Sequence, residues 1–143
     1  MRKMAIDYGD ARIGIALTDP LELTAYGLET IESTNDKKTL KRIEEIVLEY
    51  NVEMIILGMP YNADGTSGFR VEKTEKFLYK LKCKFNNIVI ETQDERYSSI
   101  EADNIMEKVQ VKSKDKKKLR DQLAAVNILE TYNRNNSKNK YKI

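Results

Sequence analysis

The sequence predicts an α/β domain in which five strands form a mixed sheet flanked by helices. Three observations indicate this class. The first 32 residues hold three short strand-like stretches with tight links between them. Helical patterns then alternate with two short apolar runs, as expected for parallel strands joined by right-handed crossovers. A helical pattern also closes the chain, so the expected order is β-β-β-α-β-α-β-α-α.

The three N-terminal strands are expected to form an antiparallel meander. Residues 2–7 and 12–18 (RIGIALT) are apolar runs separated only by the tight turn at residues 8–11. Residues 26–32 (YGLETIE) alternate between apolar and polar side chains, which is typical of a strand with one buried face.

The alternating part begins at Asn35 or Asp36, either of which can cap a helix. Apolar residues in that helix recur at i, i+3, i+4 and i+7. Two later runs, 54–58 and 87–93, are continuous and β-branched, so both are expected to be buried strands. The remaining helices are expected at about residues 69–83, 98–108 and 116–132.

A chain of 143 residues has the size of one domain. We expect that domain to span residues 1–134, followed at 135–143 by a basic, asparagine-rich tail that is disordered. The lone cysteine, Cys83, has no disulfide partner and stands at helical spacing, which favours a packing role. The first ten residues, MRKMAIDYGD, reach an acid before the apolar core of a signal peptide could form, and no apolar run approaches the length of a membrane span. We therefore expect a cytoplasmic protein that does not enter a membrane.

Charge is distributed unevenly along the chain. Residues 1–107 hold 14 Lys/Arg and 20 Asp/Glu, a net −6, whereas residues 108–120 hold seven basic residues and one acid, a net +6. The last ten residues add +4. Such runs are often solvated surface, but two basic stretches flanking one helix favour a polyanionic partner.

The absence of histidine removes the commonest general base, so any catalysis must use other groups. Asp7 ends the first apolar strand, where Gly9 and Asp10 already supply the turn chemistry. Asp94 and Glu95 follow the last strand, where one acid, but less readily two, is explained by the start of the next helix.

A third acid, Asp121, falls in the body of the last predicted helix. It shares a face with Ala124, Ala125 and Ile128, which would pack against the sheet. A carboxylate there requires a hydrogen-bond partner or a cation, and either an arginine (Arg12 or Arg96) or a metal ion would serve. Carboxylate oxygens suit Mg²⁺ or Mn²⁺, which support phosphodiester cleavage.

Four segments together resemble the YqgF/RuvX family of candidate pre-16S rRNA nucleases, which are similar to RuvC-type Holliday junction resolvases. The matching stretches are IDYGDARIGIALTDP, GMPYNADGTSG, TQDERYSS and DQLAAVNIL, in the family's order over roughly residues 4–130. The resemblance implies a ribonuclease H-like fold with sheet order 3-2-1-4-5. It also implies a metal-dependent nuclease that matures the 5′ end of 16S rRNA.

Carried over by the resemblance, Asp7, Glu95 and Asp121 are the catalytic, metal-binding acids, and Asp94 is the alternative to Glu95. One departure concerns the second acid, which RuvC-type enzymes place on the fourth strand. Here the fourth strand offers no acid until Asp64, in the following loop. The implied cofactor is Mg²⁺ or Mn²⁺.

The expected partner is structured RNA, such as pre-16S rRNA in a small-subunit precursor, with branched DNA as the alternative substrate. A non-catalytic nucleic-acid-binding module is the third reading, and a sugar-kinase-like ATPase is disfavoured because it needs two such domains. Tyr8 and Tyr97 beside the acids either pack or stack on bases, with packing favoured. The residues expected to bind nucleic acid are Arg12, Arg96, Lys114, Lys116, Lys117, Lys118 and Arg120.

Overall fold

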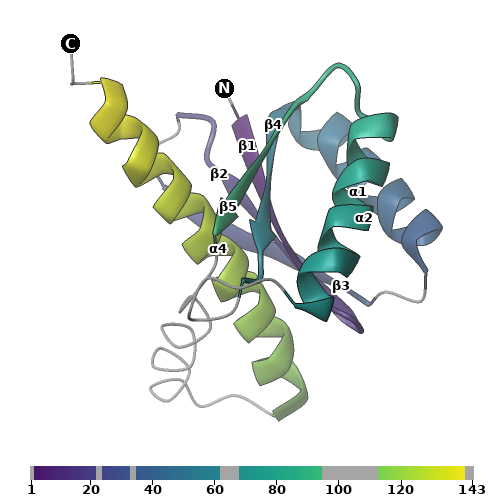
Figure 1. Cartoon of the computed structure of the whole chain (residues 1–143). Coiled ribbons are helices and arrows are strands. Elements are labelled where there is room, and N and C mark those ends of the chain that lie inside the picture. The colour runs from purple at the N-terminus through teal and green to yellow at the C-terminus, as the bar shows by residue number, and fades with distance from the viewer. Residues whose placement is uncertain (1, 22–23, 33–34, 62–67, 95–112, 141–143) are drawn as a thin grey trace.

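The protein forms a five-stranded sheet with helices on both faces (Figure 1). The structure is a computed structural model, and it describes residues 2–21, 24–32, 35–61, 68–94 and 113–140. The strand order is β3-β2-β1-β4-β5, as the family resemblance implies.

Three strands form the expected antiparallel meander: β1 (Arg2–Tyr8), β2 (Arg12–Thr18) and β3 (Ala25–Glu32). The other two, β4 (Val52–Met59) and β5 (Val89–Asp94), run parallel to β1. The sheet is therefore mixed, and the predicted α/β class is confirmed. In such sheets, ligand sites form at the carboxyl ends of the parallel strands, where β1 and β4 finish side by side.

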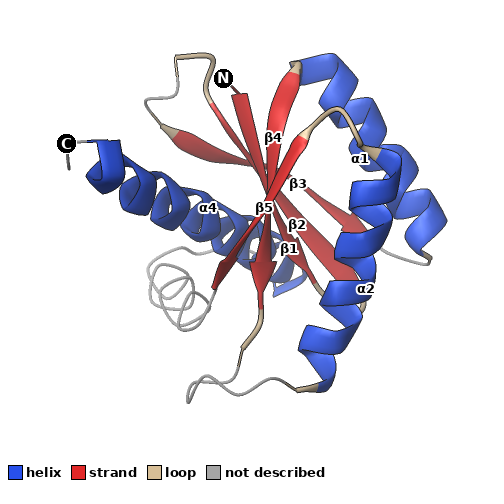
Figure 2. Cartoon of the chain, turned by 45° about the horizontal axis from the view of Figure 1, so that its top comes forward, coloured by secondary structure: helices blue, strands red, loops and turns tan. Residues whose placement is uncertain are grey.

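Helices α1 (Asp36–Tyr50) and α2 (Phe69–Lys84) cover one face of the sheet, and α4 (Ser113–Lys140) covers the other (Figure 2). The side chain of Asn35 caps α1 by accepting a hydrogen bond from the Lys38 amide at 2.8 Å. Asn51 ends α1 in the left-handed conformation at φ 53°.

The two faces of the sheet bury different kinds of side chain. The face under α1 and α2 holds a large aliphatic core in which Phe77 and Leu81 are fully buried. The buried apolar cluster under α4 is smaller, and alanines from the sheet and the helix make up half of its residues. These buried residues are Ala5, Ala16, Ile56, Ala125, Ile128 and Leu129. Because alanine keeps the backbones close, α4 lies near the sheet.

Two elements differ from the sequence expectations. The strand β5 was expected to be buried, but it lies at the edge of the sheet and Val89 is 48% exposed, so this expectation was wrong. Helix α4 is longer than expected: it begins before residue 116 and ends after residue 132. It includes residues 135–140 of the tail that was expected to be disordered. The helix expected at 98–108 lies outside the described residues. In the part of the chain that the structure describes, no helix has the length and apolar character needed to cross a membrane.

Candidate metal and nucleic-acid site

Asp7 lies near the carboxyl end of β1, on the face of the sheet that α4 covers. Its position follows from the alternation of the strand: Ala5 packs under α4, whereas Ile6 packs under α1 and α2. Asp7 is two residues beyond Ala5 and therefore shares the α4 face. Its cross-strand partner is Gly14 of β2, which lies on the same face.

Asp121 of α4 lies directly against that glycine. A β-carbon built on Gly14 would overlap the carbonyl group of Asp121 and lie 3.2 Å from the Asp121 β-carbon. Because Gly14 pairs with Asp7, the absence of a side chain on Gly14 brings the backbone of Asp121 close to Asp7. The structure thus brings the main chain of Asp121 close to the strand position of Asp7, although the two acids are 114 residues apart in the sequence.

An ion pair holds the carboxylate of Asp121. Arg12, the first residue of β2, donates from Nε to Asp121 Oδ2 at 2.8 Å. The side chain of Asp121 is 19% exposed and that of Arg12 is 37% exposed. Of the two arginines that the sequence offered as a partner for Asp121, Arg12 is the one described in contact with it.

The N-terminal half of α4 is fixed to the meander by two further contacts. Thr30 Oγ1 donates to the carbonyl of Lys118 at 2.7 Å, and Gln122 Nε2 donates to Thr30 Oγ1 at 3.3 Å. Gly27 of β3 allows the close approach of Gln122, because a β-carbon on Gly27 would lie 2.8 Å from that of Gln122. These contacts determine the position of Asp121 along the sheet.

Of the two candidates for the second predicted acid, the structure describes Asp94 and not Glu95. In the parallel register, Asp94 pairs with Met59, and Ile90 packs in the core under α1 and α2. Strand alternation therefore puts Asp94 on the α1/α2 face, opposite to Asp7. Glu95 lies outside the described residues. Strand β4 ends in Gly58 and Met59, so it supplies no carboxylate at this edge of the sheet.

The residues of this face fit a divalent cation in their donor chemistry. Asp7 and Asp121 offer hard carboxylate oxygens, which Mg²⁺ and Mn²⁺ prefer. The space that a side chain on Gly14 would occupy is filled by the main chain of Asp121, so the two acids come from closely packed backbones. Among the described residues, no group of three acidic, histidine or cysteine side chains is close enough to hold a metal. Asp7 and Asp121 are thus the two members of the predicted set of three acids that the structure describes on this face.

Five of the seven predicted nucleic-acid-binding residues belong to the first part of α4, whereas Arg12 begins β2. Lys116, Lys117 and Arg120 are exposed, and Lys118 lies 3.5 Å from Glu32 through its Nζ atom. Lys114 belongs to the same helix, and Arg96 lies outside the described residues. All these positions of α4 precede Asp121 by one to seven residues, so the basic end of the helix adjoins the two acids.

Tyr8 lies on the opposite face from Asp7 and has a packing role. Its ring stacks on Phe77 with a centroid separation of 4.2 Å, and its hydroxyl donates to Asp36 Oδ1 at 2.9 Å. Burial, and then the hydrogen bond to the Asp36 carboxylate, raise the pKa of Tyr8 to about 12. Lys80 pairs with the other oxygen of Asp36 at 2.8 Å. The end of β1 is thereby fixed to both α1 and α2.

Three residues that position Asp121 against the sheet were not predicted from the sequence: Gly14, Thr30 and Gln122. The alternation of apolar and small residues in IGIA was a usable signal for Gly14, because it puts the glycine on the same face as Ala16. No local pattern indicated Thr30, whose partners are about 90 residues away.

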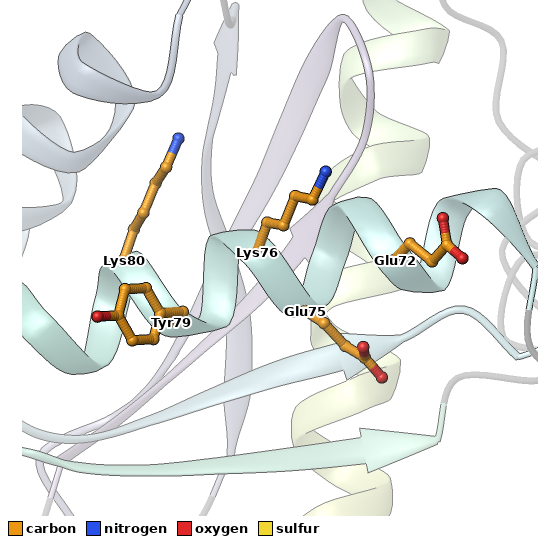
Figure 3. A pocket seen from close by; sticks show the side chains of 5 residues that line it. All are labelled: Glu72, Glu75, Lys76, Tyr79 and Lys80. Atoms are coloured by element: carbon orange, nitrogen blue, oxygen red, sulfur yellow. The ribbon is translucent and has the colours of Figure 1, made fainter.

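A surface hollow of about 510 Å³ lies on α2 and is unrelated to the acids. Its lining residues follow one another along that single helix (Figure 3), and α2 packs on the face opposite to Asp7. They are Glu72, Glu75, Lys76, Tyr79 and Lys80. A hollow with one helical wall does not enclose a ligand, so the candidate site is the acid pair beneath α4.

Two solved structures share this fold, and their titles name a resolvase or RuvC in complex with a Holliday junction. The fowlpox virus Holliday junction resolvase in complex with junction DNA matches with a TM-score of 0.57 at 19% identity, over 92% of this chain and 96% of that one. Thermus thermophilus RuvC in complex with a Holliday junction matches with a TM-score of 0.53 at 15% identity, over 94% and 95%. These likenesses concern the fold, which is ribonuclease H-like.

Family membership follows from the sequence comparisons. The family model described as "RuvX: Holliday junction resolvase" matches residues 1–135, and the chain belongs to this family. A protein of Acetivibrio thermocellus named "Putative pre-16S rRNA nuclease" is 47% identical over 92% of this chain and 94% of its own length. One of the same name from Ruminiclostridium cellulolyticum is 43% identical over 92% and 93%. The family predicted from the four motifs is confirmed.

Proposed function

We propose that this chain is a divalent-metal-dependent nuclease that hydrolyses phosphodiester bonds in structured RNA, with the precursor of 16S rRNA as its substrate. Support comes from membership of the RuvX family and from the names of relatives at 43–47% identity, which refer to pre-16S rRNA. The corresponding place of action is the cytoplasm, on the precursor of the small ribosomal subunit.

The observation that carries this proposal is the contact of Asp121 with Gly14, the cross-strand partner of Asp7. Asp7 and Asp121 share one face of the sheet, and their carboxylate oxygens are the kind of ligand that Mg²⁺ and Mn²⁺ prefer. The placement of two such acids from separate elements on one face supports a shared divalent cation as their ligand. In the proposal Asp7, Asp121 and Glu95 are the catalytic residues that hold this ligand.

The proposed ligand is Mg²⁺ or Mn²⁺, which activates a water molecule and stabilises the leaving oxygen in phosphodiester hydrolysis. We prefer Glu95 to Asp94 as the third acid, because Asp94 lies on the α1/α2 face.

The other residues of the site act on the substrate backbone and on the acids. Lys114, Lys116, Lys117, Lys118 and Arg120 give the start of α4 its positive charge, and in the proposal they bind phosphates beside the cleaved bond. Arg12 fixes the carboxylate of Asp121. Arg96 is proposed as a further phosphate ligand.

The test is cleavage of an RNA spanning the 5′ end of precursor 16S rRNA by purified protein, with and without Mg²⁺ or Mn²⁺. Cleavage is expected only with the metal and only with wild-type protein, and Asp7→Asn is expected to bind the RNA without cutting it. Metal-independent cleavage, or equal cleavage by both proteins, would count against the proposal.

Branched DNA is the second candidate substrate. The family description and the titles of the two fold relatives, which name Holliday junctions, favour it. A four-way DNA junction in the same assay separates the two candidates. Cleavage of the junction with no cleavage of RNA would show that the substrate is branched DNA. Binding of either substrate without cleavage would show that the protein is a non-catalytic nucleic-acid-binding module.

A further inference from the structure

We propose that Arg12 is the counter-ion of Asp121 in the metal-free protein and gives up this carboxylate when a divalent cation binds. The inference rests on the proposed function, because it concerns the same acids. It adds an exchange: Asp121 is paired with a guanidinium in one state and with the metal in the other.

The metal-free protein needs such a counter-ion. Asp121 is 19% exposed and is brought by Gly14 to the carboxylate-bearing end of β1. A carboxylate that is largely removed from water requires a compensating charge or hydrogen bonds. Arg12 Nε supplies both at 2.8 Å from Asp121 Oδ2. The arginine therefore balances the charge of the carboxylate and orients it when no metal is present.

The same contact opposes metal binding. Arginine is a donor with no acceptor atom, so it cannot itself become a metal ligand. A guanidinium bonded to Asp121 Oδ2 occupies that oxygen and repels a divalent cation beside it. The side chain of Arg12 is 37% exposed and stands at the first residue of β2, so it can move into water without disturbing the core.

A second arginine pair provides a matched control. Arg42 of α1 contacts Glu29 of β3 through Nε at 2.9 Å and through Nη2 at 2.6 Å. The Arg42 side chain is also 37% exposed. It belongs to α1, on the face of the sheet opposite to α4 (Figure 2). Removal of Arg42 therefore tests the loss of an arginine–carboxylate pair without altering the environment of Asp7 and Asp121.

The experiment is calorimetric titration of MnCl₂ into the metal-free full-length protein, together with thermal unfolding with and without Mn²⁺. Arg12→Gln is expected to bind Mn²⁺ about five-fold more tightly than wild type, the change expected when a partly exposed ion pair no longer competes. Its metal-free Tm is expected to fall, and its Tm increase on adding Mn²⁺ is expected to exceed that of wild type. Arg42→Gln is expected to lower the Tm and leave the Mn²⁺ affinity unchanged.

Equal or weaker Mn²⁺ binding by Arg12→Gln would overturn the inference. Should Arg12→Gln fail to fold, Arg12→Lys keeps the charge with a single donor group, and its Mn²⁺ affinity is still expected to exceed that of wild type. RNA cleavage is measured on the same preparations. Metal-dependent cleavage with equal Mn²⁺ affinities overturns the inference alone, whereas absence of both Mn²⁺ binding and cleavage in wild type overturns the proposed function as well.

Discussion

Gly14 on β2 and Asp121 on α4 are in direct backbone contact, and no other residue type fits at position 14 without moving the helix. The contact couples the fold to the candidate site, because Gly14 is also the cross-strand partner of Asp7. A strand register and a helix position thereby place the two acids together, although neither acid contributes to the apolar core.

Gly14→Ala is therefore expected to displace α4 and to impair cleavage. The added methyl group would overlap the main chain of Asp121, which cannot move like a flexible side chain. Overpacking of this kind costs about 1–3 kcal/mol of unfolding free energy. Urea unfolding measures this loss, and the RNA assay measures the loss of activity.

Gly27→Ala is the control for that substitution. Its β-carbon would lie 2.8 Å from the Gln122 β-carbon, which side-chain rotation does not move, so α4 must shift slightly. This shift is smaller than the one that overlap with the Asp121 main chain requires, so a smaller loss of stability and of cleavage than in Gly14→Ala is expected. If Gly27→Ala proved as damaging as Gly14→Ala, the special role of the Gly14–Asp121 contact would be refuted.

Much of the fold was predictable from local patterns. The meander, the helix capped by Asn35 and the alternation that follows all appear in the sequence as periodicity and turn chemistry, and the sheet order came from the family resemblance. The exposure of β5 was not predictable, because an apolar run such as NIVI looks the same in a central strand and in an edge strand. Burial of a strand depends on its neighbours.

The acids of the candidate site were predictable from the sequence, whereas the residues that hold Asp121 in position were less so. Asp7 and Asp121 were identified because each conflicts with its local apolar setting. The identity of the arginine that pairs with Asp121 depends on a contact between residues 109 positions apart, so the sequence left Arg12 and Arg96 open. The same reason hid Thr30 and Gln122.

Asp7→Asn is expected to abolish cleavage without unfolding the protein. The substitution keeps the size of the side chain and removes a negative charge beside Asp121, so the Tm is expected to stay level or rise. Asp10→Asn is the matched control, because this exposed acid pairs with Lys73 at 2.9 Å and lies in the turn that follows β1. Full activity in Asp10→Asn and none in Asp7→Asn is the expected result, whereas a folded Asp7→Asn with wild-type activity would exclude Asp7 from catalysis.

Tyr8→Phe is expected to flatten the alkaline decline in stability. The pKa of Tyr8 is raised from 10.0 to about 12, so folding favours the protonated phenol. The stability that this group contributes is present below about pH 10 and is lost as the pH rises through about 12. Unfolding free energy measured across this range should fall less in Tyr8→Phe than in wild type. An identical decline in both proteins would exclude Tyr8 as its source.

The double variant Lys116→Gln/Lys117→Gln is expected to weaken RNA binding and to reduce the salt dependence of the affinity. Each lost phosphate contact lowers the slope of log K against log salt by roughly 0.7–0.9. Lys37→Gln/Lys38→Gln removes two exposed lysines from α1, on the other face of the sheet, and is expected to leave the slope unchanged. Equal slopes for both variants would show that α4 has no special role in binding.

The acids beneath α4 are proposed to form a metal-dependent nuclease site for RNA. Its most direct test is cleavage of a precursor 16S rRNA fragment by wild type and Asp7→Asn, with Mn²⁺ and after chelation of the metal. Cleavage products are expected only when wild-type protein and Mn²⁺ are both present. Products that persist after chelation, or in folded Asp7→Asn, would contradict it.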